Sequence, residues 1–98
     1  MDADDISAKK PTILVVDDTE LNRDLLHRRL KKNGYHVALA VDGHDALSQL
    51  RGADFDLVLL DIMMPVMDGY QVLEAVKADQ KLRHIPVIMI TSLSEMDS

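Results

Sequence analysis

Three apolar segments of this sequence end in side chains that can do chemistry. Asp17 and Asp18 follow the run ILVV, Asp61 follows LVLL, and Thr91 follows VIMI. Carboxylate oxygens with no Cys or His beside them are ligands for hard cations, with Mg²⁺ first and Mn²⁺ or Ca²⁺ next. A hydroxyl group can donate a hydrogen bond to an anionic oxygen. A metal, a carboxylate nucleophile and a hydroxyl donor together indicate phosphoryl transfer to an aspartate.

These side chains can act together only if the chain brings them to one edge of a sheet. The sequence predicts four strands and three helices that alternate: strands at 12–17, 36–40, 55–61 and 87–90, and helices at 20–33, 43–51 and 70–78. The first strand is continuously apolar rather than alternating, as expected when helices cover both faces of a parallel sheet. Such an α/β chain has right-handed crossovers and binds ligands at the carboxyl ends of its strands.

Local signals support these bounds. Asp42 and Asp68 precede predicted helices and are expected to cap them, and Gly34 is the expected left-handed residue after the first helix. That helix places Leu21, Leu25, Leu26 and Leu30 at helical spacing, with its basic residues largely on the side that faces water.

The adjacent aspartates have two interpretations. Neighbouring Asp residues at a strand end often only cap the next helix. If the first and third strands are neighbours, however, Asp17, Asp18 and Asp61 crowd together. Two unit charges about 4 Å apart repel by about 4 kcal/mol at an effective dielectric constant near 20. A divalent cation is the simplest compensation. Thr91 also has two interpretations. It is either a hydroxyl that merely ends a strand, or a hydrogen-bond donor opposite the acidic cluster.

Composition narrows the function classes. With 98 residues the chain is one domain or less, and 47% hydrophobic residues are enough for a packed core. The absence of Cys excludes disulfides and thiolate metal sites. The net charge, 11 − 17 = −6, argues against a nucleic-acid surface. No apolar run suits a signal peptide or a membrane span, so we expect a soluble cytoplasmic protein.

Two further groups of residues are given structural interpretations. Met63, Met64 and Met67 could form a soft-metal site, but loop packing is the favoured interpretation. The four His residues are scattered, and we expect them at the surface or at its boundary.

Three motifs give the sequence a family resemblance: VVDD, DIMMPVMDG at 61–69, and TS at 91–92. With their separation they resemble the receiver domain of bacterial two-component response regulators over residues 12–98, which leaves residues 1–11 as a flexible lead-in. The resemblance implies a flavodoxin-like parallel sheet with strand order 2-1-3-4 and helices on both faces.

The resemblance also implies roles for individual residues. Asp61 would accept a phosphoryl group from the His of a sensor histidine kinase or a phosphotransfer protein. Asp18, Asp61 and the backbone carbonyl of Met63 would bind Mg²⁺, with Mn²⁺ as an alternative, and Asp17 would act mainly through a bound water. Thr91 would turn inward to bond a phosphoryl oxygen, which switches the surface presented to an output domain or docking partner.

The sequence departs from the family pattern at its C-terminal end. Receiver domains continue with a fourth helix, a fifth strand ending in Lys, and a fifth helix, whereas here only Lys77 and Lys81 follow Asp61. We therefore expect a receiver domain truncated after its fourth strand, or a piece of a longer protein. The apolar fourth strand would then be an open edge, suited to homodimers or strand exchange. A phosphorylation-incompetent interaction module is the alternative function.

An enzyme is the third hypothesis. Some Mg²⁺-dependent phosphatases use an Asp nucleophile on an α/β sheet, in a D-x-D pattern after the first strand. Here that segment is DDT, and the better nucleophile follows the third strand, so we expect no enzyme. Apolar Met63 and Leu93 flank the route of water to a phosphorylated Asp61, which predicts slow hydrolysis.

Overall fold

The computed structural model describes residues 10–64 and 66–91. The expected lead-in therefore lies outside the described residues, apart from Lys10 and Pro11. Leu93, expected to flank the water route, lies outside them as well.

Strands and helices alternate throughout the described chain, and short loops join them. The elements are β1 (Thr12–Val16), α2 (Glu20–Lys32), β2 (His36–Ala40), α3 (Gly43–Gly52), β3 (Leu57–Asp61), α4 (Gly69–Ala78) and β4 (Val87–Ile90). Every predicted element is present, and the predicted bounds are confirmed to within two residues.

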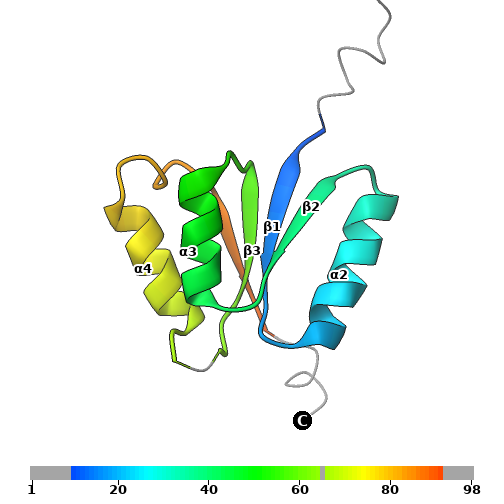
Figure 1. The fold of residues 1–98 in the computed structure, drawn as a ribbon, viewed down its shortest axis with the longest axis horizontal. Helices are drawn as coiled ribbons and strands as arrows, with labels where there is room; N and C mark the ends of the chain where they lie inside the picture. Colours follow the sequence, from blue (N-terminus) through cyan, green and yellow to red (C-terminus); the bar gives the residue numbers. More distant parts are fainter. Residues whose placement is uncertain (1–9, 65, 92–98) are drawn as a thin grey trace, which may run out of the picture.

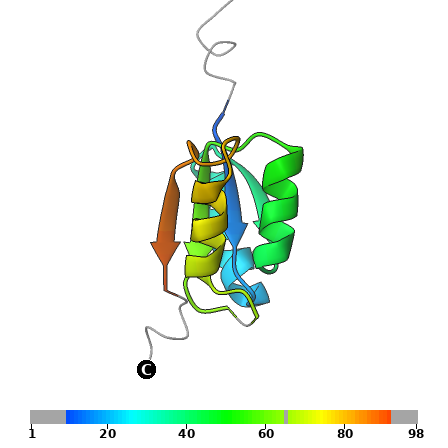
Figure 2. The same ribbon diagram turned by 90° about the vertical axis from the view of Figure 1, so that its left-hand side faces the viewer.

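The strands form one parallel sheet in the order β2-β1-β3-β4. Helix α2 covers one face of this sheet, and α3 and α4 cover the other (Figure 1; Figure 2). The predicted flavodoxin-like arrangement, with strand order 2-1-3-4, is thus confirmed. Because Val16 pairs with Leu60, the carboxyl ends of β1 and β3 lie side by side at one edge of the sheet.

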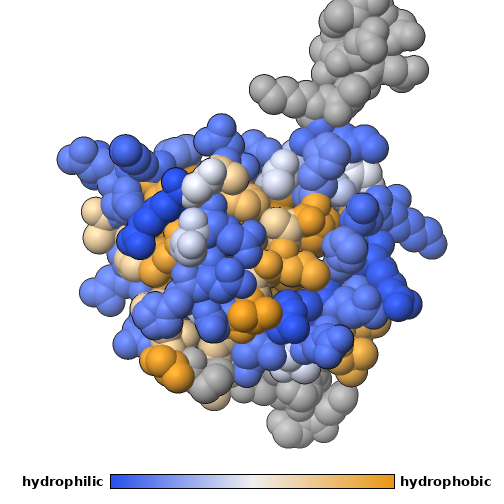
Figure 3. All heavy atoms as spheres, in the orientation of Figure 1, coloured by the Kyte–Doolittle hydropathy of each residue, from blue (hydrophilic) through white to orange (hydrophobic). Residues whose placement is uncertain are grey.

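The core is aliphatic, as the composition predicts. It lies mainly between the sheet and the α3–α4 layer, where Leu14, Val16, Val58 and Leu60 have no exposed surface. Figure 3 shows hydrophilic side chains over the helices, with apolar side chains reaching the surface between the two helix layers. None of the described helices is both long and apolar enough to cross a membrane.

Helix α2 buries less of its leucine face than the spacing predicts. Leu26 and Leu30 are half-buried, whereas Leu21 is 64% and Leu25 is 37% exposed. Helical spacing alone therefore does not place Leu21 and Leu25 in the core. Helix α2 packs mainly on β1 and β2, and no other described helix lies beside it on that face. A helix with a single packing surface buries one narrow stripe, which here includes Asn22.

The helix ends carry the predicted caps. Asp42 Oδ1 accepts a hydrogen bond from the Asp45 N–H at 2.7 Å. Asp68 and Gln71 form a reciprocal capping box at the start of α4. Gly34 has the expected left-handed backbone, with a φ of 93°, so the chain turns sharply from α2 into β2.

Candidate functional site

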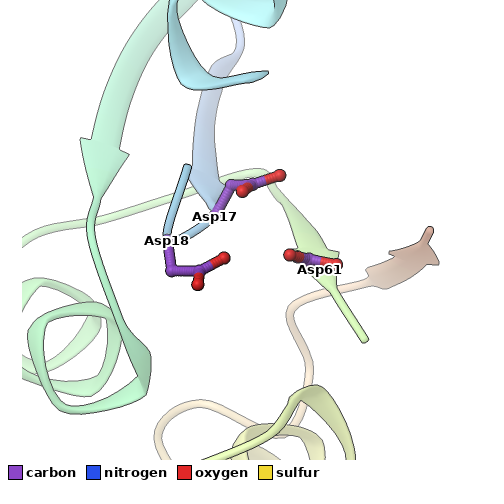
Figure 4. A group of neighbouring side chains, drawn as sticks. All are labelled: Asp17, Asp18 and Asp61. Carbon is purple, nitrogen blue, oxygen red and sulfur yellow. The ribbon is translucent and has the colours of Figure 1, made fainter. Parts of the chain in front are cut away.

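Three aspartates from two neighbouring strands meet at the carboxyl edge of the sheet. Asp17 and Asp18 come directly after β1, and Asp61 is the last residue of β3. One carboxylate oxygen from each lies within 4.8 Å of the other two. Figure 4 shows Asp18 and Asp61 extending toward each other, with Asp17 beside them. Asp17 and Asp61 are buried, and Asp18 is open to solvent, so the cluster can be reached from one side.

Asp17 is held by hydrogen bonds that leave one of its oxygens unused. Its Oδ1 accepts from the Thr19 N–H at 2.8 Å, and its backbone N–H donates to the Ala40 carbonyl at 3.1 Å. Its buried Oδ2 has no hydrogen-bond partner among the described residues. Burying an anionic oxygen without a donor is costly, so this oxygen is suited to a ligand that is not among the described residues.

Arg23 takes part in fixing the strand end, which the sequence did not predict. It was expected on the wet side of its helix, but it is half-buried, and its Nη1 donates to the Asp17 carbonyl at 2.8 Å. Its place six residues after Asp17, near the start of α2, is the signal that could have found it. The guanidinium ties the first turns of α2 to the end of β1.

The β3–α4 loop begins over the carboxylate of Asp61. Asp61 Oδ1 accepts from the Met63 N–H at 3.1 Å, and the Gly69 N–H donates to the Ile62 carbonyl at 3.0 Å. A Cβ atom on Gly69 would lie 2.5 Å from the Asp61 carbonyl oxygen and 2.8 Å from Ile62 Cα. Only a residue without a side chain lets α4 start this close to the end of β3.

The methionines of this loop have separate surroundings. Met64 is buried in the core, and the Met63 side chain is 59% exposed. Met67 packs on α3, where a Cβ atom on Gly43 would lie 2.7 Å from its Sδ. These positions support loop packing rather than a shared soft-metal site.

Thr91 lies at the same edge of the sheet as the aspartates. It follows Ile90, which pairs with Asp61 in the register of β3 and β4, and the Ile62 N–H donates to the Ile90 carbonyl at 2.9 Å. Thr91 is exposed. Its position agrees with the sequence prediction, while the role of its hydroxyl stays a prediction.

The acidic cluster fits a hard divalent cation. At 4.8 Å, two unit charges repel by about 3.5 kcal/mol at an effective dielectric constant of 20. All of the converging side-chain atoms are carboxylate oxygens, which Mg²⁺, Mn²⁺ and Ca²⁺ prefer. The unused buried Oδ2 of Asp17 has the same explanation. Charge and donor set therefore both favour a bound cation.

The two lysines that follow Asp61 in the sequence lie away from this edge of the sheet. Lys77 stands at the far end of α4 from Gly69, and it donates to the Arg83 carbonyl at 3.3 Å. Lys81 follows in the loop before β4 and lines a groove with Phe55 at the amino ends of the strands. The four His residues are exposed or half-buried, which confirms their predicted surface or boundary positions.

Residues 13–98 match the response regulator receiver domain family. The chain belongs to this family. Receiver domains are signalling modules rather than catalytic enzymes, so the phosphatase alternative is set aside. The strand order, the meeting of the aspartates and the family match agree with one another.

Relatives in the curated proteins are longer than this chain. The chain is 48% identical over 81 residues to the response regulator PleD of Caulobacter vibrioides, covering 83% of this chain and 18% of PleD. It is 40% identical over 86 residues to the chemotaxis protein CheY of Pseudomonas aeruginosa, covering 87% of this chain and 69% of CheY. The chain thus spans less than a fifth of the length of PleD.

Solved receiver structures share the fold. The N-terminal domain of a response regulator receiver protein from Methanoculleus marisnigri superposes with a TM-score of 0.81 at 46% identity, over 83% of this chain and 66% of that chain. TrrA from Thermotoga maritima, solved in complex with Mg²⁺-BeF, gives a TM-score of 0.78 at 35% identity, over 87% of this chain and 72% of that chain.

Proposed function

We propose that this receiver domain is a phosphorylation switch in which Asp61 is the phosphoacceptor. The phosphoryl group comes from a phosphohistidine on a sensor histidine kinase or on a phosphotransfer protein. The observation that carries the proposal is the acidic cluster, in which one oxygen from each of Asp17, Asp18 and Asp61 lies within 4.8 Å of the others. A protein keeps such repulsion where a function uses it.

Asp61 is the best nucleophile of the three. It is the last residue of β3, an inner strand of the sheet. The Met63 N–H donates a hydrogen bond to its Oδ1 and so orients the carboxylate. In the transfer, a carboxylate oxygen of Asp61 forms a bond to phosphorus while the P–N bond of the phosphohistidine breaks. The electron pair of that bond stays on the imidazole nitrogen, which takes up a proton.

The other acidic residues support this step by holding a cation. Asp18, Asp61 and the Met63 carbonyl are the proposed direct ligands of Mg²⁺, or alternatively Mn²⁺, and Asp17 acts mainly through a bound water. When bound, the ion neutralises the carboxylates and the charge on the incoming phosphoryl oxygens. The unused Oδ2 of Asp17 and the Mg²⁺-BeF complex of TrrA support this assignment.

Thr91 is the proposed switch residue. It follows the strand residue paired with Asp61, so its hydroxyl can turn toward a phosphoryl oxygen and donate a hydrogen bond. This movement shifts the population between two surface states, and an output domain or docking partner reads the change.

Intact mass spectrometry after incubation with acetyl phosphate and MgCl₂ tests the proposal. We expect the wild-type chain to gain one phosphoryl group, and Asp61→Asn to gain none. The matched control is Asp54→Asn, which removes an exposed carboxylate in the loop before β3 and should be phosphorylated like the wild type. Replacing MgCl₂ with EDTA should abolish the gain.

No mass gain in the wild type, from a chain that binds Mg²⁺ and is folded by circular dichroism, would overturn the phosphoacceptor proposal. The interaction-module alternative would then take its place. A gain that persists in Asp61→Asn would move the phosphoacceptor to another residue.

A further inference from the structure

Among the Arg and Lys residues of α2, Arg23 alone is half-buried. The exposed ones are Arg28, Arg29, Lys31 and Lys32. Within the described part of the chain, no carboxylate lies at ion-pairing distance from the Arg23 guanidinium. Its Nη1 donates instead to the backbone carbonyl of Asp17 at 2.8 Å. Arg23 therefore acts on the backbone of the acidic site rather than on its carboxylates.

The Arg23 contact fixes the peptide unit that joins Asp17 to Asp18. Strand β1 ends at Val16, so Asp17 lies beyond the last residue of the strand. The Asp17 N–H still donates to the Ala40 carbonyl at 3.1 Å, which holds one side of the residue. On the other side, Arg23 is the only described residue that bonds to the Asp17–Asp18 peptide. Without the guanidinium, this peptide is free to rotate.

The direction of the Asp18 carboxylate depends on this peptide. Asp18 is exposed, and the hydrogen bond that Thr19 Oγ1 donates to its Oδ1 is long, at 3.5 Å, and therefore weak. An Asp18 oxygen nevertheless lies within 4.8 Å of oxygens of Asp17 and Asp61, and Figure 4 shows the side chain extending toward Asp61. Rotation of the preceding peptide would swing it out of the cluster.

We infer that Arg23 is a positioning residue for the bound cation. Its guanidinium holds the Asp17–Asp18 peptide so that the Asp18 carboxylate faces Asp61, and this raises the affinity of the site for Mg²⁺. The inference rests on the metal site of the proposed function, but not on phosphoryl transfer. Groups that orient metal ligands without touching the ion commonly change metal affinity by about tenfold to a hundredfold.

The positive charge of Arg23 separates this role from simple electrostatics. A guanidinium at the Asp17 carbonyl repels an incoming cation, so the loss of its charge alone would tighten Mg²⁺ binding. The loss of its hydrogen bond lets Asp18 turn away from the cluster, which weakens Mg²⁺ binding. The two roles therefore predict changes of opposite sign in the Kd for Mg²⁺.

Calorimetric titration of the 98-residue chain with MgCl₂ measures this Kd without a phosphoryl donor. Arg23→Met keeps a long side chain of similar helix propensity but no donor, and we expect it to raise the Kd about tenfold. Arg23→Lys keeps a donor and should recover part of this loss. The matched control Arg28→Met removes the same charge at an exposed position of α2. It should leave the Kd within about twofold of the wild type, because exposed charges are screened by salt.

The dependence of phosphorylation on Mg²⁺ gives a second readout. The MgCl₂ concentration for half-maximal transfer from acetyl phosphate should rise in Arg23→Met by the same factor as the Kd.

Hydrogen exchange in the wild type gives a third readout, which needs no variant and decides the matter if Arg23→Met does not fold. Coupling is reciprocal, so the ion should in turn stabilise the Arg23 contact. The Arg23 backbone amide, which donates to the Thr19 carbonyl at 3.1 Å, should exchange more slowly in MgCl₂ than in EDTA. The Asp79 amide after α4 should respond less.

Three results would overturn the inference. They are a folded Arg23→Met that binds Mg²⁺ as tightly as the wild type or more tightly, an equal loss of affinity in Arg28→Met, and an Arg23 amide whose exchange does not respond to MgCl₂. The proposed function fails separately. A wild type with the expected Mg²⁺ binding but no gain of a phosphoryl group would overturn the phosphoacceptor proposal alone. A phosphorylated wild type with an unchanged Kd in Arg23→Met would overturn only the role of Arg23.

Discussion

The carboxylates of Asp17 and Asp61 are buried side by side at the ends of β1 and β3, and an oxygen of each lies within 4.8 Å of the other. Two buried charges of one sign oppose folding unless something compensates them. This repulsion lowers the folding stability of the metal-free protein, and a bound cation would restore that stability. Stability and metal binding are therefore linked at this pair.

We expect Asp17→Asn to stabilise the metal-free protein by about 1–2 kcal/mol, because it removes one of the repelling charges. The asparagine Oδ1 can still accept from the Thr19 N–H. Urea unfolding in EDTA measures this gain. In MgCl₂ the wild type should recover, since a ligand at a hundredfold its Kd adds about 2.7 kcal/mol, while Asp17→Asn should respond much less.

Asp54→Asn is the matched control for this measurement. It removes an exposed charge at the opposite end of the sheet and should change stability little in either buffer. A metal-free Asp17→Asn that is less stable than the wild type would contradict the prediction that the cluster is strained.

Gly69→Ala should destabilise the protein by about 1–3 kcal/mol, the usual cost of overpacking. The added Cβ atom would meet backbone atoms of Asp61 and Ile62 at 2.5 and 2.8 Å, and backbone atoms cannot rotate away. The loop carrying Met63 must shift, so the gain of a phosphoryl group from acetyl phosphate should fall as well.

The control for this variant is Gly52→Ala, whose Cβ atom would meet nothing within 4 Å at the end of α3. Alanine favours the helix, so we expect neutral or slightly raised stability. Thermal unfolding of both variants compares them directly. Equal effects at the two glycines would mean that the close approach of α4 to β3 does not constrain residue 69.

The meeting of the aspartates could be predicted from the sequence because the signals for each strand end are local. Asp17 and Asp61 each end an apolar strand, and parallel strands bring their carboxyl ends to one edge. The caps Asp42 and Asp68 also depend on residues three positions away. The sequence therefore correctly predicted features that depend on residues a few positions apart, such as strand ends and helix caps.

Features set by distant neighbours could not be predicted in this way. The leucine spacing of α2 does not reveal that Leu21 and Leu25 lack a packing partner, because that depends on which helices share the face. The hydrogen bond from Gln49 Nε2 to the Leu39 carbonyl could not be predicted either, since the two residues are ten positions apart. Tertiary contacts decide both features.

Val66 lies in the left-handed region, with a φ of 68°, which a β-branched residue rarely adopts. Its side chain is 92% exposed, so no packing compensates the strain. We expect Val66→Asn to stabilise the protein by about 1 kcal/mol, because Asn tolerates this conformation. Thermal unfolding measures the gain. The control Val41→Asn, at another exposed valine without a positive φ, should give no gain.

We expect the Met63 side chain to border the route by which water would reach a phosphorylated Asp61. Its side chain is 59% exposed and offers a water molecule no strong hydrogen-bond partner. We expect Met63→Asn to speed phosphate loss about threefold to tenfold, which corresponds to at most about 1.4 kcal/mol in the barrier. The amide can hold a water beside the acyl phosphate, whereas the thioether cannot.

The decay of the phosphorylated mass after removal of acetyl phosphate measures this rate. Val66→Asn is the control, because it introduces the same amide into the same loop at a position more exposed than Met63. If both variants accelerate the loss equally, loop mobility rather than the amide beside Asp61 explains the effect. If Met63→Asn leaves the rate unchanged, the apolar side chain does not protect the phosphoryl group, and the prediction that it slows hydrolysis is wrong.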